Sequence, residues 1–198
     1  VDVSNGVGSI PVGNTDIVYC NFINTTNPGS ITIIKDAQPN DPQDFSFTTT
    51  GTGLTNFTLD DDSNPTLSDT KVFSNLMPGT FTIIEDDISD WSLDSITCST
   101  GGVVDLVNKK ATVTLTAGLD VTCTFTNKIQ TGHIIIEKQT DPDGSTKSFE
   151  FNPSWSDTNF FLIDGQNIDS GALLPGTYSI SELEPLGWDS TSSCDDGS

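Results

Sequence analysis

The stretch VTCTFTN at residues 121 to 127 alternates apolar and polar side chains, and VYCNFIN at residues 18 to 24 repeats its pattern. Such alternation is typical of a β-strand with one buried face, because successive side chains point to opposite sides of a strand. The valine, cysteine, phenylalanine and final asparagine of each stretch therefore share one face. Both stretches are expected to be strands of the same kind.

The similarity extends outward over longer segments of the chain. GSITIIKDA at 29 to 37 resembles GHIIIEKQT at 132 to 140, and MPGTFTIIEDD at 77 to 87 resembles LPGTYSISELE at 174 to 184. Self-similarity at a period of about a hundred residues indicates a tandem repeat. The chain is therefore expected to contain two related units.

The second unit is divided between the two ends of the chain. Residues 131–198 contain no counterpart of the last two strands of the complete repeat, which we assign to residues 29–130. Residues 1–24 supply that counterpart, since they align with residues 104–127 at a constant offset: 123 − 20 and 127 − 24 are both 103. We therefore divide the chain into an N-terminal donor segment (1–28), the complete repeat and an incomplete acceptor repeat.

Short apolar runs separated by loops rich in Asp, Asn, Gly and Pro predict strands, and no window shows a sustained helical period. The expected fold class is all-β. In the complete repeat we expect strands near 30–35, 44–49, 55–59, 70–75, 80–86, 91–98, 111–116 and 120–127.

Three arrangements satisfy the divided repeat. Residues 1–28 can complete a neighbouring molecule, because an unpaired sheet edge accepts an added strand. They can instead fold back onto residues 131–198 of their own chain, or the sequence can be one period of a long tandem polyprotein. We favour completion of the second repeat in trans, because head-to-tail addition that does not close gives an open filament.

The chain is strongly acidic: it has seven Lys, no Arg and one His, with a net charge of −21. Without Arg or a basic cluster, neither phosphate clamps nor nucleic-acid grooves can be assembled. No apolar run approaches the roughly 18 residues that would span a bilayer. We therefore expect no nucleic acid and no membrane insertion, and the expected partner is another copy of the chain.

The four cysteines lack the CxxC spacing of zinc or thioredoxin-like sites and so predict disulfides in an oxidising compartment. Cys98 and Cys123 of the complete repeat correspond to Cys194 and Cys20 of the divided one. We expect one disulfide between Cys98 and Cys123 of a single chain, and one between Cys20 and Cys194 of neighbouring chains. The expected location is extracellular or at the cell surface.

The motifs ITIIKD, PGTFTIIE and CTFTN, with PGTYSISELEPLGW in the second copy, resemble the Cna B-type, or prealbumin-like, domains of bacterial pilins and surface adhesins. The resemblance covers essentially the whole chain. It implies tandem Ig-like or transthyretin-like β-sandwiches. It also implies an isopeptide bond from a Lys on the first strand to an Asn on the last, promoted by a Glu on a strand between them.

The residues that match this pattern are Lys35, Glu85 and Asn127 in the complete repeat and Lys138, Glu182 and Asn24 in the divided one. Alternation places all six on the apolar faces of their strands. Burial lowers the pKa of Lys and raises that of Glu, so a neutral amine can attack the carboxamide while a protonated Glu polarises its carbonyl and ammonia leaves. The alternative is a buried ion pair hydrogen-bonded to Asn without a covalent bond.

Two further expectations concern modification and catalysis. Asn56-Phe57-Thr58 has the form of a glycosylation sequon, and Asn56 is expected to face solvent. The sequence contains neither a metal-ligand pattern nor a cofactor motif, and no nucleophile, base and orienting group occur together. We expect no metal, no cofactor and no enzyme activity beyond single-turnover formation of the isopeptide bond.

These observations predict a structural subunit of an extracellular, pilus-like filament assembled head to tail by donor-strand complementation. The alternative is a spacer or stalk segment of a large repetitive cell-surface adhesin. In that case a binding head would lie outside this sequence. Glycans are a further expected partner in either case.

Overall fold

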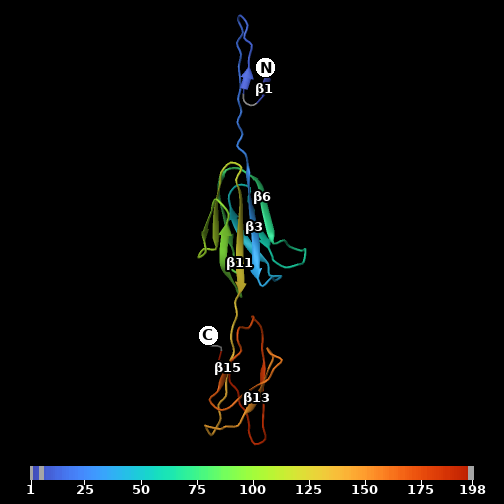
Figure 1. Ribbon diagram of the computed structural model, residues 1–198, viewed down its shortest axis with the longest axis vertical. Coiled ribbons are helices and arrows are strands. Elements are labelled where there is room, and N and C mark those ends of the chain that lie inside the picture. Colours follow the sequence, from blue (N-terminus) through green and yellow to red (C-terminus); the bar gives the residue numbers. More distant parts are fainter. Residues whose placement is uncertain (1, 5–6, 196–198) are drawn as a thin grey trace.

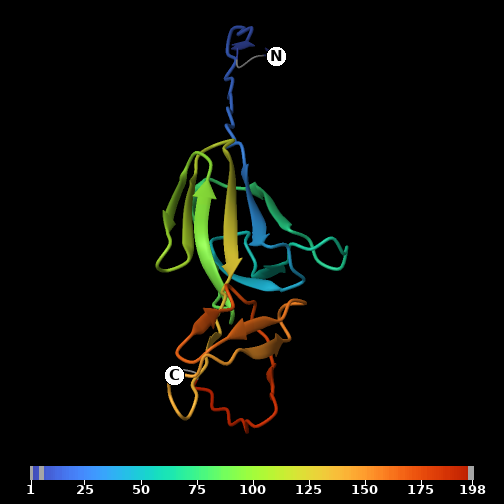
Figure 2. The same ribbon diagram turned by 60° about the horizontal axis from the view of Figure 1, so that its bottom comes forward.

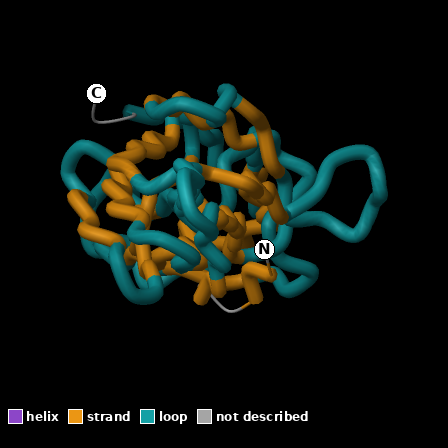
Figure 3. Tube along the Cα trace, turned by 90° about the horizontal axis from the view of Figure 1, so that it is seen from above, coloured by secondary structure: helices purple, strands orange, loops and turns teal. Residues whose placement is uncertain are grey.

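The computed structural model describes residues 2–4 and 7–195. All regular elements in this part of the chain are β-strands, as Figure 3 shows by the absence of helical colouring. Figure 1 shows three parts along one long axis: an N-terminal segment, a large sandwich and a smaller group of strands. The predicted all-β fold is confirmed.

The complete repeat consists of two sheets, one with four strands in the order β6-β3-β11-β8 and one with five in the order β5-β4-β7-β10-β9. Their curvature around a common core is visible in Figure 2. Its strands are β3 (Gly29–Gln38), β4 (Phe45–Thr50), β5 (Phe57–Leu59), β6 (Thr70–Leu76), β7 (Gly79–Glu85), β8 (Trp91–Cys98), β9 (Gly102–Asp105), β10 (Lys110–Leu115) and β11 (Asp120–Ile129). The strand β9 is absent from the predicted strands, because four residues are too few to display alternation.

The first and last strands of this repeat are parallel neighbours. The pairing of β3 with β11 runs from Ser30 opposite Asp120 to Gln38 opposite Lys128. Because the two strands point the same way, the chain enters the sandwich at one pole and leaves it at the other (Figure 1). Successive repeats are thereby arranged as a rod.

Alternating side chains of these strands build the core. In β3, Ile31 and Ile33 are fully buried, and in β11 the buried residues include Val121 and Phe125. Removing a side chain of this size from water stabilises a fold by about 1.5 to 3 kcal/mol. The predicted inward face of the stretch at 121 to 127 is therefore the face on which the sandwich is built.

The second repeat contains two small sheets, β12 with β15 and β14-β13-β16. They correspond to β3 with β6 and to β5-β4-β7 of the complete repeat. The strands are β12 (Ile135–Glu137), β13 (Phe149–Pro153), β14 (Phe160–Leu162), β15 (Asn167–Asp169) and β16 (Ile180–Leu183). The N-terminal segment adds a hairpin of β1 (Asp2–Ser4) and β2 (Val7–Ser9).

The aromatic residues show that the two repeats are built alike. Each core has a stacked pair of phenylalanines and an edge-to-face pair of phenylalanine and tryptophan. The centroid distances are 4.8 Å for Phe47–Phe57 and 5.3 Å for Phe151–Phe160, then 5.4 Å for Phe45–Trp91 and 5.1 Å for Phe149–Trp188. The internal repeat read from the sequence is therefore also a repeat of side-chain geometry.

The second repeat has two open sheet edges within the described residues. In the complete repeat, β3 pairs with β11 and β7 pairs with β10. Their counterparts β12 and β16 pair only with β15 and β13, on the opposite sides. The open positions are the ones that β10 and β11 fill in the complete repeat.

A disulfide joins β8 to β11 in the complete repeat. Cys98 and Cys123 lie directly opposite each other in the sheet, and their sulfur atoms are bonded. Gly102 lies against this bridge, because a Cβ at that position would stand 2.3 Å from Cβ of Cys98. Cys20 and Cys194 are free and exposed.

We expect the Cys98→Ser/Cys123→Ser variant to lose about 3 kcal/mol of unfolding free energy, because the bridge closes a loop with a sequence separation of 25 residues. Denaturant titration of the non-reduced proteins measures the loss. Cys20→Ser/Cys194→Ser is the matched control and should leave the unfolding of the complete repeat unchanged. Labelling of Cys98 in the native, non-reduced protein would contradict the assignment.

Candidate functional site

Three polar side chains lie together inside the complete repeat. The Lys35 ammonium donates a hydrogen bond to Oδ1 of Asn127 at 2.8 Å, and Nδ2 of Asn127 donates to Oε2 of Glu85 at 2.9 Å. The Lys35 nitrogen lies 3.9 Å from Oε1 of Glu85, and both side chains are fully buried. The first, fifth and last strands of the complete repeat, β3, β7 and β11, thus bring the predicted residues into one site.

The site is electrostatically unfavourable for charge. Burial lowers the pKa of Lys35 to about 8, although the nearby Glu85 opposes this change. Burial likewise raises the pKa of Glu85, against the hydrogen bond from Asn127 and the charge of Lys35. Oε1 of Glu85 is buried without a hydrogen-bond partner. Both shifts favour transfer of a proton from the amine to the carboxylate.

The ammonium group of Lys35 lies over an aromatic ring. The Lys35 nitrogen lies 4.0 Å from the centroid of the Phe45 ring. It also donates to the backbone oxygens of Phe125 and Asp36, at 3.2 and 3.1 Å. The ring and carbonyls hold the amine beside the carboxamide of Asn127. The sequence analysis missed Phe45, although its counterpart Phe149 lies in the same way 4.0 Å from the Lys138 nitrogen.

This arrangement is suited to amide exchange between Lys35 and Asn127. The amine lies beside the carbonyl oxygen of the carboxamide, while Glu85 contacts the nitrogen that would leave as ammonia. Glu85 was expected to polarise the carbonyl of Asn127, but its Oε2 instead accepts the hydrogen bond from Nδ2, the nitrogen that would leave. A carboxyl group in that position can protonate the departing nitrogen.

The second repeat brings together only two of its three predicted residues. Lys138 and Glu182 form an ion pair of 2.8 Å, and their side chains are 13% and 16% exposed. The N-terminal segment, to which Asn24 belongs, extends from the opposite pole of the complete repeat (Figure 1). The fold-back arrangement, in which residues 1–28 complete their own chain, is not the one adopted.

Residues 11–28 of the N-terminal segment leave their apolar side chains in solvent. Val18 is 41% exposed and Phe22 is 63% exposed, whereas their counterparts Val121 and Phe125 are buried. Cys20 and Asn24 are exposed as well. Residues 18 to 24 therefore have the apolar face of a core strand, but this face is exposed.

A carboxylate that the sequence analysis missed anchors the end of the first strand in each repeat. Asp61 accepts a hydrogen bond from the backbone nitrogen of Ala37 at 2.8 Å. Asp164 accepts from the backbone nitrogens of Thr140 and Gly144 at 2.6 and 2.7 Å, and these bonds lower its pKa. The available signal was the recurrence of Asp at the repeat offset of 103 residues.

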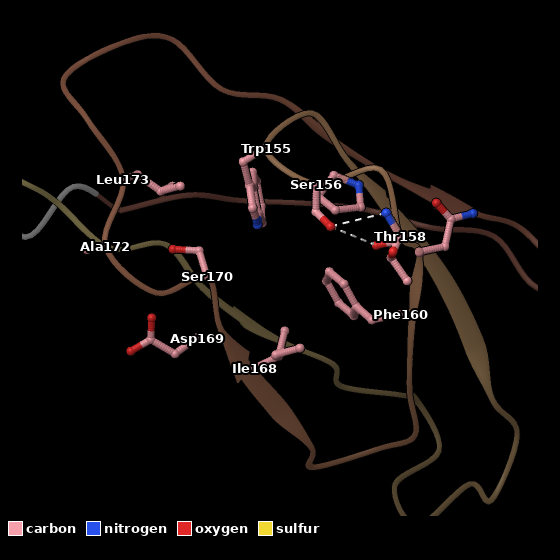
Figure 4. A pocket seen from close by; sticks show the side chains of 11 residues that line it. Trp155, Ser156, Thr158, Phe160, Ile168, Asp169, Ser170, Ala172 and Leu173 are labelled. Carbon is pink, nitrogen blue, oxygen red and sulfur yellow. Dashed lines mark hydrogen bonds between the residues drawn. The ribbon is translucent and has the colours of Figure 1, made fainter.

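A hollow of about 500 Å³ opens in the second repeat, and the side chains of Trp155, Phe160, Ile168 and Ser170 border it in Figure 4. Ser170 bonds to the backbone of Ile134. The buried Phe73 has the corresponding place in the complete repeat, opposite Ile31. The hollow therefore lies beside a serine that stands at the place of a core phenylalanine.

The remaining predictions concern modification, metals and membranes. Asn56 is exposed, and its side-chain oxygen accepts a bond from the backbone of Thr49 at 2.9 Å. Residues 2–4 and 7–195 hold no group of three or more His, Cys, Asp or Glu side chains placed to bind a metal ion. The same residues include no helix that is long and apolar enough to cross a membrane.

A sandwich closed by parallel pairing of its first and last strands, with a Lys, Glu and Asn in its core, defines the class of domain. The family model described as a Prealbumin-like fold domain matches residues 31–129, which are half of the 198 residues. The chain belongs to the family of prealbumin-like fold domains, and the predicted resemblance is confirmed. No curated protein matches the chain.

Solved structures with a similar fold include a bacterial adhesin, the TIE protein and a major pilin. An adhesin from Mobiluncus mulieris, containing intramolecular disulfide, isopeptide and ester bond cross-links, is 19% identical over 52% of this chain and 41% of its own, with a TM-score of 0.40. The TIE protein of Bacillus anthracis is 16% identical over 84% and 30% of the two chains, with a TM-score of 0.49. The major pilin T-13 of Streptococcus pyogenes is 19% identical over 83% and 85%, with a TM-score of 0.42. The chain thus spans less than half the length of the first two.

We expect Lys35→Met to lower the unfolding free energy by about 3 to 5 kcal/mol at neutral pH, because it leaves the Glu85 carboxylate buried without a cation. Lys35→Met/Glu85→Met also lacks the amine but should be more stable than the single variant. Folded Glu85 retains its proton to a higher pH than unfolded Glu, whose ordinary pKa is 4.5. The single variant should therefore lose stability as the pH rises above that value, and the difference between the variants should widen. Denaturant titration over a pH series tests this, and equal stability of the two variants would contradict it.

Proposed function

We propose that the protein is a structural subunit of an extracellular, pilus-like filament. Subunits add head to tail by donor-strand complementation: residues 1–28 of one molecule complete the second repeat, residues 131–198, of the next. The observation that carries the proposal is the correspondence between two features of the fold. In the complete repeat β11 pairs with β3 and β10 pairs with β7, whereas the corresponding edges of β12 and β16 are open. Residues 7–24 have the sequence pattern of β10 and β11.

The register of the complete repeat defines how the donor would lie. In β11, Val121 is opposite Ile31 and Asn127 is opposite Ala37. Subtracting the offset of 103 from the β11 positions, and adding it to those of β3, places Val18 opposite Ile134 and Asn24 opposite Thr140. In that register Asn24 reaches the Lys138 and Glu182 pair, and Cys20 occupies the place that Cys123 has beside Cys98.

Donation is favourable on energetic grounds. Each large apolar side chain transferred from water into a core contributes about 1.5 to 3 kcal/mol. The donor also pairs with the free backbone N–H and C=O groups along the open edges of β12 and β16. Left unpaired, these groups can bind any other strand and cause aggregation. Because the chain enters and leaves a sandwich at opposite poles, each addition extends a rod and does not close a ring.

Covalent bonds would make the assembly permanent. The Cys20–Cys194 disulfide between neighbours corresponds to Cys98–Cys123 within the complete repeat, and disulfides persist in oxidising, extracellular surroundings. A bond from Lys138 to Asn24 of the neighbour would be the second cross-link, promoted by Glu182. Glycans on the exposed Asn56 are compatible with such a location.

We expect Phe22→Asp to abolish filaments, because the substitution places a carboxylate in the core of the neighbouring molecule. Asn14→Asp, which adds the same charge between the two donor strands, is the matched control and should assemble normally. Deleting residues 1–24 should also prevent assembly while the complete repeat stays folded. Electron microscopy and size-exclusion chromatography of the 198-residue chain measure these outcomes.

Assembly that persists without residues 1–24 would contradict donor-strand complementation. Filaments isolated from the producing cell provide a second test. After reduction and boiling they should run as a ladder of subunits or as monomers, whereas a single giant chain without a ladder would support the polyprotein arrangement. A 198-residue chain that stays monomeric and folded would favour the spacer or stalk of a larger adhesin, a role that the same rod geometry permits.

We also propose that the site in the complete repeat forms an isopeptide bond. Glu85 takes a proton from the Lys35 ammonium, and the neutral amine attacks the carboxamide carbon of Asn127. The bond from that carbon to Nδ2 breaks, and the proton held by Glu85 passes to the nitrogen that leaves as ammonia. The attacking nitrogen gives up its surplus proton to the Glu85 carboxylate as the new amide forms. Burial lowers the pKa of the Lys35 amine and raises that of the Glu85 carboxyl, and both changes support this step.

We expect the folded protein to be lighter by one ammonia, and Glu85→Gln to restore the full mass. Glu182→Gln is the matched control, because Glu182 lies in the second repeat, and its monomer should keep the mass deficit of one ammonia. The reactive pair shares one proton, so the rate on refolding should be highest between the raised pKa of Glu85 and the Lys35 pKa of about 8. Above that range the pair loses the proton that the leaving nitrogen needs, and below it the amine stays protonated. Mass spectrometry measures this on chain that is kept in denaturant from its synthesis onward, before the bond can form, and then refolded at a series of pH values. A folded wild-type mass without deficit would leave only a buried ion pair.

A further inference from the structure

The inner face of the stretch 18 to 24 does not distinguish this stretch from β11. Four inner positions of the stretch 18 to 24 are Val, Cys, Phe and Asn, and the four inner positions of the stretch 121 to 127 are the same residues. The two stretches differ only at the positions between these. Selection between the stretch 18 to 24 and a β11 strand must therefore depend on the outer face.

The outer face of the donor segment is unlike that of β11. Tyr19 is 92% exposed and Asn21 is exposed, and both stand where β11 has the threonines Thr122 and Thr124. A tyrosine with almost its whole surface in water has no contact that explains its choice at this position. A partner that covers it would supply one.

The outer face of β12 differs from that of β3 in a matching way. Ile135, which is 67% exposed, and the exposed Glu137 stand where β3 has Thr32 and Ile34. In the complete repeat Thr122 is opposite Thr32, and Thr124 is opposite Ile34. The divided repeat has replaced both members of each outer pair.

We infer that the outer faces of the donor segment and of β12 form a recognition code between two copies of this chain, in which Tyr19 of one copy packs on Ile135 of the next and Asn21 donates a hydrogen bond to Glu137. The register that pairs β11 with β3 puts each of these residues opposite its partner. One pair is aromatic with β-branched and the other is amide with carboxylate. Both are stabilising side-chain pairs on a sheet surface.

The code also rejects the wrong strand. A β11-type strand entering the second repeat would place Thr122 beside Ile135 and Thr124 beside Glu137, which loses the apolar contact and the amide donor. The second repeat would therefore take the N-terminal segment of another copy in preference to a β11 strand from an unfolded chain. This inference rests on the proposed donor-strand function and names the residues that give it specificity.

The test compares two synthetic peptides as caps of growing filaments of the full wild-type chain. One peptide has the sequence of residues 7–28, and the other carries Tyr19→Thr and Asn21→Thr, the outer residues of β11. The altered peptide should need about fivefold more material for half-inhibition, since two pairs contribute roughly two- to threefold each. A peptide with Asn14→Ser, between the donor strands, is the control and should match the native peptide.

A reciprocal exchange on the acceptor keeps the test independent of peptide behaviour. In the full chain carrying Ile135→Thr and Glu137→Ile, which has the outer residues of β3, the preference between the two peptides should disappear or reverse. The recognition code alone would be overturned by either of two results. One is the same ratio of half-inhibitory concentrations of the two peptides on both chains, and the other is equal inhibition of wild-type growth by both peptides. If neither peptide slows growth, the donor-strand function itself is overturned.

Discussion

The parallel pairing of β3 with β11 is the constraint on which the rest of the structure depends. It makes the two ends of a repeat neighbours in one sheet, so a repeat cannot be divided between its early and late strands without opening that sheet. It also sets Lys35 of β3 beside Asn127 of β11, because neighbouring inner positions of paired strands lie within reach of each other. The rod-like succession of repeats, the buried polar site and the open edge of the second repeat all follow from this pairing.

The two copies of the polar site differ in how far they exclude water. In the complete repeat the Lys and Glu are fully buried, and the Asn side chain bridges them. In the second repeat the Lys and Glu contact each other directly and retain some exposure. Partial hydration lowers the cost of holding two charges in an apolar site. The partly exposed pair of the second repeat is therefore held at a lower cost than the fully buried pair of the complete repeat.

Most of the fold and the membership of this site could be predicted from the sequence, because both depend on strand alternation and on the repeat offset. Alternation along single strands placed Lys35, Glu85 and Asn127 on inner faces without knowledge of the topology. What alternation cannot provide is orientation: the carboxamide of Asn127 turns its nitrogen to Glu85 because of contacts from three strands at once. The support of the amine by Phe45 and the hollow beside Ser170 likewise depend on packing between sheets, which a pattern along one strand does not contain. The short strand β9 was missed because its position comes from pairing with β10 and not from its own sequence.

The same strand pairing decides how the molecule would respond to being pulled. A tension applied along the rod enters the complete repeat at the start of β3 and leaves it at the end of β11. These two strands are adjacent and parallel, so the load acts along their shared row of hydrogen bonds and strains all of them together, in contrast to a hairpin, which opens one bond at a time. The remaining strands of the sandwich lie outside the direct line of force. The two ends of the domain thus lie on adjacent strands, and the domain keeps its length under load for as long as β3 and β11 stay paired.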